Sequence, residues 1–183
     1  PSSPAPTDLD GESSTKRIPI ASTSLSGRGR PEPVTEGRIP VCTPLLGEAE
    51  VRNVNDAMAQ GAISGFFGDY LPAFEEGFAE FCECPHGVAV NSGTTALHLA
   101  LATLGIGPGD EVIFCTHTMV ATAAAIYFSG ATAVPIECGP DHLIDPTAVE
   151  GAISARTKAI MPTQLNGRTC DMDALQAIAD LHG

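Results

Sequence analysis

The sequence of 183 residues is poor in basic side chains: nine Lys and Arg stand against 22 Asp and Glu, and the formal net charge is −13. Because nucleic acids and anionic membrane surfaces repel an acidic protein, this balance disfavours both as partners. The sequence has no run of about 18 apolar residues, so no segment is predicted to span a membrane. It shows no cationic start followed by an apolar core, so we expect no secretion signal and a cytoplasmic location.

The six cysteines lack the paired spacing of a zinc-binding motif. The segment 82–86, CECPH, combines one C-x-C with a single histidine, which is fewer ligands than a structural zinc site uses. The other four cysteines stand alone within or beside predicted strands and helices, as is typical of reduced, partly buried thiols. We therefore predict neither a metal site nor a framework of disulfides.

Two common phosphate-binding motifs are also missing. The sequence has no G-x-G-x-x-G after its first predicted strand and no G-x-x-x-x-G-K-[S/T]. The strand 88–90 is followed instead by NSGTT at 91–95, which turns directly into a helix. Unpaired N–H groups and hydroxyls at such a helix start suit a single phosphate. Capping of the helix by Ser92 and Thr94 explains the same residues, and the turn alone does not decide between the two.

The N-terminal part of the sequence differs in composition from the rest. Residues 1–38 are rich in Pro, Ser, Gly and Thr, and we predict a disordered leader, because so few apolar residues cannot offset the entropy of ordering. From Ile39 onward, helices are predicted at 47–61 and 71–82. Three aromatic residues of the second helix recur at helical spacing and are predicted to lie in the core: Phe74, Phe78 and Phe81.

Strands and helices then alternate. Strands are predicted at 88–90, 111–115, 131–136 and 159–163, and helices at 94–104, 119–128, 146–155 and 171–182. Repeated strand–helix units of this length predict an α/β fold with a mostly parallel sheet and helices on both faces. The segments 91–95, 116–119 and 164–168 each follow a strand, so we expect them to meet at the carboxyl rim of the sheet, where ligands usually bind.

Several motifs in a fixed order carry a family resemblance. They are NSGTTALHLAL, GIGPGDEVI, TMVAT, TKAI and LNGR followed by CDMD. With these motifs, residues 39–183 resemble the N-terminal half of the DegT/DnrJ/EryC1/StrS sugar aminotransferases. The resemblance implies the aspartate-aminotransferase-like fold (PLP fold type I), incomplete at the C-terminus. It also implies pyridoxal 5'-phosphate (PLP) as cofactor, a nucleotide-linked keto-sugar as substrate, glutamate as amino donor, and a homodimer.

The resemblance also assigns candidate site residues. Four residues match the turn that holds the cofactor phosphate in the family: Ser92, Gly93, Thr94 and Thr95. Met119 stands where many members place an aromatic ring against the pyridine, and its thioether packs less well on a ring face. Ser64 and Gly65 lie in a loop, 64–68, that approaches the substrate in the family. Gln164 occupies a rim position where many relatives have histidine.

No catalytic residue is predicted within these 183 residues. Transamination needs a lysine and a carboxylate beside the pyridine nitrogen, and in the family both lie further along the sequence. Lys16 falls in the leader and Lys158 just ahead of a predicted strand, so we expect the chain alone to be inactive. One alternative is a non-catalytic phosphate-binding or dimerising fragment of the same fold. A nucleotide-binding oxidoreductase domain is disfavoured by the missing glycine motif.

Overall fold

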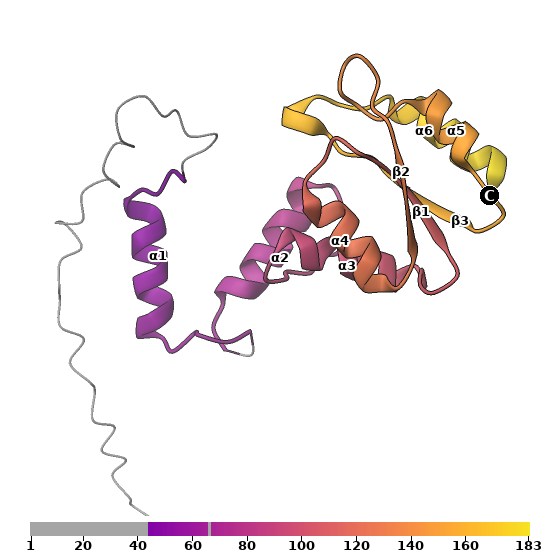
Figure 1. Cartoon of the computed structure of the whole chain (residues 1–183). Helices are drawn as coiled ribbons and strands as arrows, with labels where there is room; N and C mark the ends of the chain where they lie inside the picture. Colours follow the sequence, from indigo (N-terminus) through magenta and orange to yellow (C-terminus); the bar gives the residue numbers. More distant parts are fainter. Residues whose placement is uncertain (1–43, 66) are drawn as a thin grey trace, which may run out of the picture. The chain divides into compact units, whose positions relative to one another are not determined.

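The computed structural model describes residues 44–65 and 67–183 (Figure 1). The chain divides between Arg52 and Asn53 into two units, and each is described by itself. The described part of the first unit is residues 44–52, which include the start of α1, Glu48–Ala59. There the Gly47 N–H donates to Oε2 of Glu50 at 2.6 Å. The predicted leader 1–38 and its boundary with the folded part lie outside the described residues.

The second unit contains a three-stranded parallel sheet in the order β2-β1-β3. The strands are β1 Glu111–Cys115, β2 Thr132–Ile136 and β3 Thr157–Met161. In the central strand β1 every residue is buried. Cys115 of β1 lies opposite Ile136 of β2, and Ile113 lies opposite Ile160 of β3. The parallel α/β architecture predicted from the alternating pattern is confirmed.

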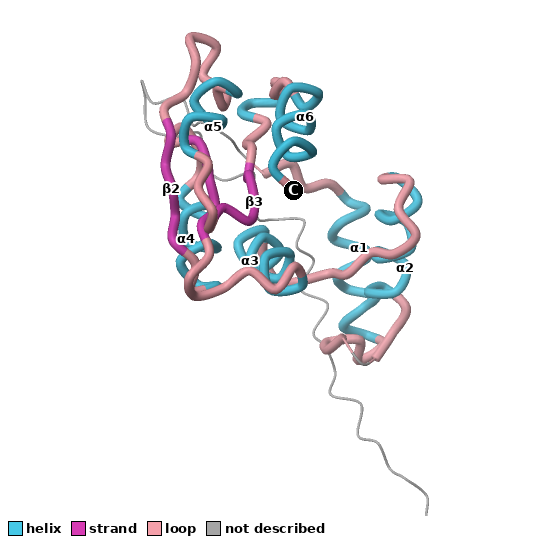
Figure 2. The backbone as a smooth tube through the Cα atoms, turned by 90° about the vertical axis from the view of Figure 1, so that its right-hand side faces the viewer, coloured by secondary structure: helices cyan, strands magenta, loops and turns pink. Residues whose placement is uncertain are grey.

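Two pairs of helices cover the two faces of the sheet (Figures 1 and 2). One pair is α3, Gly93–Thr103, with α4, Val120–Ser129; the other is α5, Pro146–Ala152, with α6, Met172–His182. Val112 and Phe114 of β1 pack with residues of α3 and α4, whereas Ile113 and Cys115 pack with residues of α5 and α6. Successive side chains of a strand point to opposite faces, so β1 supplies both cores. None of the helices in the described residues is long and apolar enough to cross a membrane.

The predicted core position of the aromatic stripe is wrong. Helix α2 spans Tyr70–Phe81, and Phe74, Phe78 and Phe81 are 58%, 54% and 84% exposed. Only Ala79 of this helix is buried. Phe74 and Phe78 stack on each other with ring centroids 5.7 Å apart, but no element of the described residues covers the stripe. Helical spacing identified one face of the helix and not whether another layer packs on it.

The predicted strand at 88–90 is also wrong, because strand structure requires a neighbouring strand. Among the described residues no strand pairs with this segment. The Ala89 N–H donates instead to Oε1 of Glu75 in α2 at 2.8 Å, and Val88 is 72% exposed. The sheet therefore has one strand fewer than predicted, and the segment reaches the 91–95 turn along α2.

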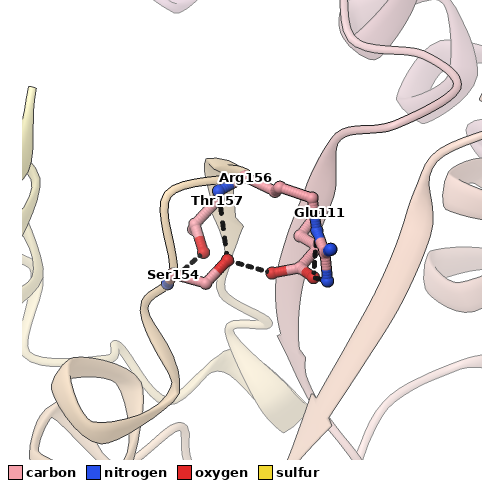
Figure 3. Close-up of polar contacts among 4 residues, drawn as sticks. All are labelled: Glu111, Ser154, Arg156 and Thr157. Carbon is pink, nitrogen blue, oxygen red and sulfur yellow. Dashed lines mark hydrogen bonds and ion pairs between the residues drawn. The ribbon is translucent and has the colours of Figure 1, made fainter.

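Helix α5 ends three residues earlier than predicted, and β3 lies two residues earlier, at 157–161 instead of 159–163. Ile153 has an extended backbone, and the Thr157 N–H donates to the Ser154 carbonyl at 3.1 Å, so a turn ends α5 early and β3 starts at 157. At this turn the Glu111 carboxylate accepts from the Ser154 hydroxyl at 2.5 Å and from Nε of Arg156 at 2.9 Å (Figure 3). The Ser154 hydrogen bond, followed by those from Arg156, holds the pKa of Glu111 below its ordinary value. These contacts fix the start of β1 against the start of β3.

Candidate active site

The turn that precedes α3 is held by its own side chains. Ser92 has an extended backbone, with φ −163° and ψ 159°, and its Oγ accepts from the Thr95 N–H at 3.2 Å. The Thr95 hydroxyl donates to Oδ1 of Asn91 at 2.7 Å and lies 3.0 Å from the Ser92 hydroxyl. Ser92 is therefore the N-cap of α3, as the capping interpretation requires.

Capping leaves part of this turn open to a ligand. The N–H groups of Gly93 and Thr94 lie in the first turn of α3, where no intrahelical acceptor exists for them. A Cβ placed on Gly93 would meet no atom within 4 Å, so the space beside this residue is open. Donors at the positive end of a helix, beside open space, suit an anion. The turn can hold a phosphate while Ser92 caps the helix.

The loop after β1 is tied to the end of β3 by hydroxyl groups. Oγ1 of Thr118 lies 2.8 Å from Oγ1 of Thr122 and 2.8 Å from Oγ1 of Thr163. Thr122 is 5% exposed, so the group is partly shielded from water. This brings the segments after β1 and β3 together at the rim, which is part of the prediction. No hydrogen bond among the described residues joins the 91–95 turn to either of them. The sequence analysis did not identify Thr122 and Thr163 as site residues. The only sequence pattern that points to their contact with Thr118 is a threonine after each of two neighbouring parallel strands.

Met119 lies directly after this threonine and is the N-cap residue of α4. Its side chain is 71% exposed, and its backbone is extended, with φ −69° and ψ 144°. The hydrogen-bonded Thr118 fixes the backbone next to it. Met119 therefore offers its thioether on a positioned loop at the rim of the sheet.

Gln164 is engaged in contacts within the connection from β3 to α6. Its Oε1 accepts from the Cys170 N–H at 2.5 Å, and its Nε2 lies 3.3 Å from Sδ of Met172. The Cys170 thiol donates to the Thr163 carbonyl at 3.3 Å. The amide of Gln164 thus positions the backbone of this connection. Asp171 caps α6 by accepting from the Ala174 N–H at 3.0 Å.

Ser64 and Gly65 lie in the loop before α2, and both are exposed. The Ser64 carbonyl accepts from the Phe67 N–H at 3.1 Å. No hydrogen bond among residues 44–65 and 67–183 joins Ser64 or Gly65 to the 91–95 turn or to the rim at Thr118 and Gln164. Hydrogen bonds therefore join the rim segments after β1 and β3 to each other and do not join this loop to them.

Comparison with known proteins identifies the family. The sequence profile of the DegT/DnrJ/EryC1/StrS aminotransferase family matches residues 44–183. The chain belongs to this family. It is 47% identical over 150 residues to the dTDP-3-amino-3,4,6-trideoxy-alpha-D-glucose transaminase of Streptomyces venezuelae, a match that covers 80% of the chain and 40% of that relative.

Solved structures agree with this membership. DesV of S. venezuelae, solved in complex with a ketimine intermediate, is 50% identical with a TM-score of 0.66, and the match covers 74% of the chain and 38% of DesV. Spr1654 of Streptococcus pneumoniae, solved in its PLP form, is 36% identical with a TM-score of 0.69, covering 76% of the chain and 36% of Spr1654. The expected family and fold are confirmed. The chain spans 36–40% of the length of these three relatives.

Proposed function

We propose that the whole protein is a PLP-dependent aminotransferase that converts a nucleotide-linked keto-sugar to an amino-sugar, with glutamate as amino donor. The family match over residues 44–183 carries this proposal. The Streptomyces relative is a transaminase of a dTDP-linked amino-sugar, which supports the substrate class. We also propose that the whole protein is a homodimer in the cytoplasm, as the family resemblance implies.

The 91–95 turn is the proposed binding site of the cofactor phosphate. The N–H groups of Gly93 and Thr94 would donate to phosphate oxygens, and the hydroxyls of Ser92 and Thr95 lie beside them. The open space at Gly93 supports this role, because a phosphate needs close access to the backbone. The positive end of α3 adds a favourable field for the anion.

Met119 is proposed to lie against the cofactor ring. Its exposed thioether stands on a loop that Thr118 anchors to Thr122 and Thr163, so the backbone that presents it is held in place. A thioether is polarisable and makes favourable contacts with ring systems, although it covers a ring face less completely than an aromatic side chain.

Substrate contacts are proposed at Ser64, Gly65 and Gln164. The exposed Ser64 and Gly65 would reach the sugar from the 64–68 loop. Gln164 would act mainly by positioning the connection from β3 to α6, since its side-chain amide already accepts from the Cys170 N–H. Substrate binding at Gln164 would therefore require this amide to share or exchange a hydrogen bond.

The lysine for this reaction is proposed to lie outside the 183 residues. When bound, PLP carries the amino group between donor and acceptor, and a lysine anchors it and moves the proton. Lys158 is exposed and is the second residue of β3, so it lies near the end of the strand that faces away from the carboxyl rim. Lys16 is outside the described residues. The residues of this chain would bind and orient the cofactor, and the chain alone is expected to be inactive.

The experiment is reductive labelling. The 183-residue chain is mixed with PLP and reduced with borohydride, and labelled lysines are mapped by mass spectrometry; Lys158→Arg serves as the control for surface labelling. We expect no stoichiometric label in the chain and a single labelled lysine in a longer protein translated from the same gene. Stoichiometric labelling at Lys158 would contradict this assignment. Failure of the longer protein to bind PLP would contradict the proposed function itself.

A further inference from the structure

Three potential metal ligands meet at the carboxyl end of the sheet. They are His117 in the loop after β1, Cys138 after β2, and His142 in the loop that leads to α5. One ligand atom from each of them lies within 4.8 Å of the other two. Among residues 44–65 and 67–183, no other three His, Cys, Asp or Glu side chains form such a group. The exposed Cys82, Cys84 and His86 are not brought together in this way.

The register of β1 and β2 explains why His117 and Cys138 lie close together. Cys115 of β1 lies opposite Ile136 of β2, and the Thr116 N–H donates to the Ile136 carbonyl at 2.9 Å. The segments that follow β1 and β2 therefore leave the sheet side by side. Two residues beyond the last aligned pair, His117 and Cys138 lie next to each other.

A hydrogen-bonded loop brings the second histidine to this pair. Cys138 forms an isolated antiparallel bridge with Ile144, and the Gly139 N–H donates to the Leu143 carbonyl at 2.9 Å. The His142 N–H closes the loop by donating to the Gly139 carbonyl at 2.9 Å.

Within this loop His142 adopts a backbone that few residues accept. Its φ is +67°, in the left-handed region that is uncommon for residues other than glycine. Its ring centroid lies 5.2 Å from that of His117, with an angle of 81° between the rings. The loop therefore holds the imidazole of His142 over that of His117 in spite of the backbone cost.

The geometry points to a Zn²⁺ site formed by His117, Cys138 and His142, with a fourth position open to water. Two imidazole nitrogens and one thiolate are donors that Zn²⁺ prefers. With bonds of about 2.0–2.1 Å to nitrogen and about 2.3 Å to sulfur, tetrahedral ligand atoms lie about 3.4–3.6 Å apart. The present separations, all within 4.8 Å, need to close by no more than about 1.4 Å, which side-chain rotation supplies. Cys138 is half-buried and both histidines are exposed, so an ion can enter from solvent.

The site differs from the metal-free expectation drawn from the sequence. That expectation rested on spacing along the chain, and these ligands are 21 and 4 residues apart in sequence, without a recognised motif. Their juxtaposition comes from strand pairing. A bound ion would link the loops that follow β1 and β2, and it does not depend on the proposed aminotransferase activity.

The test is metal binding by the whole 183-residue chain, reduced and without an affinity tag. Zn²⁺ is titrated against a chromophoric chelator, and Co²⁺ is added separately as a spectroscopic probe. We expect one Zn²⁺ per chain and a thiolate-to-cobalt charge-transfer band. Cys138→Ser should abolish the band, and His142→Asn should weaken binding at least tenfold. Asparagine is chosen because it tolerates the left-handed backbone. The matched control is a variant with both Cys84→Ser and His86→Asn, which should bind Zn²⁺ as the unaltered chain does.

A second measurement needs no variant. Zn²⁺ should protect Cys138 from alkylation by iodoacetamide, as mapped by mass spectrometry, and should leave Cys84 reactive. The proposal is overturned if Cys138 is not protected, if Cys138→Ser retains the one-to-one site, or if the control variant loses it. Circular dichroism of each variant establishes that it is folded before binding is compared.

Discussion

Two glycines, Gly87 before the 91–95 turn and Gly77 in α2, should respond in opposite ways to replacement by alanine. At Gly87 a Cβ would lie 2.5 Å from the carbonyl oxygen of Glu75 and 3.2 Å from its carbonyl carbon. These are backbone atoms of α2 and cannot rotate away. The Ala89 N–H, two residues further, donates to Oε1 of Glu75 and holds the chain against the same helix. Gly87→Ala must therefore push the segment away from α2.

The magnitude follows from this contact. Relieving it moves backbone by several tenths of an ångström and strains the Ala89 hydrogen bond, so Gly87→Ala should lower the free energy of unfolding by about 1–3 kcal/mol. The matched control is Gly77→Ala in the same helix, where a Cβ meets no atom within 4 Å. That change should raise the free energy of unfolding by up to about 1 kcal/mol, because alanine favours a helix over glycine.

The assay is urea unfolding followed by circular dichroism, with the slope of each transition compared between variants. A second control, Gly93→Ala, should leave stability within about 1 kcal/mol, since its Cβ also meets no atom. The reasoning is refuted if Gly87→Ala is as stable as Gly77→Ala. If it holds, Gly87 is the residue that lets the chain follow α2 closely and deliver the 91–95 turn to its place.

Three further predictions concern the site and its support. Gly93→Val should leave the fold intact and reduce PLP binding in the longer protein, as measured by absorbance titration. An unchanged affinity for PLP would contradict the assignment of the phosphate-binding site to the 91–95 turn. Ser92→Ala should cost about 1 kcal/mol in urea unfolding, since the Thr95 N–H loses its acceptor. The pKa of Glu111 is held below 4.5 in the fold, so its stabilising contribution is present at neutral pH and is lost as pH falls through that lowered pKa. Glu111→Gln should flatten the loss of stability measured by urea unfolding between neutral and acidic pH, and an unchanged pH dependence would show that the Ser154 and Arg156 contacts contribute nothing.

The elements that the sequence predicts best are those determined by local pattern. The bounds of β1, 111–115, match the structure, because a continuous run bounded by a Gly-Asp turn has no competing interpretation. Ser92 as a cap is equally local, since a serine before a helix has its acceptor within three residues. Helices α4 and α6 begin one residue from the predicted starts for the same reason.

The failures share one cause, which is dependence on distant partners. An apolar stretch such as 88–90 is a strand only if another strand lies beside it, and the phenylalanine stripe of α2 is core only if another layer covers it. Sequence periodicity carries no information on either condition. The hydroxyl contact between Thr118 and Thr163 and the group formed around Cys138 were missed in the same way, because strand register creates both.

The register between β1 and β3, set at the start of these strands, determines which side chains meet at the carboxyl rim of the sheet. Glu111 aligns with Thr157, but Val112 aligns with Ala159, so the register shifts by one residue at the start of β3. The contacts of Glu111 with Ser154 and Arg156 hold the strands at this shift. Because side chains alternate between faces, a slip of one residue would place each side chain of β3 on the wrong face. It would also part the hydroxyls of Thr118 and Thr163 at the rim. The ion pair of Glu111 with Arg156, at the opposite end of the sheet from the rim, is thus a condition for the geometry of the loop that presents Met119.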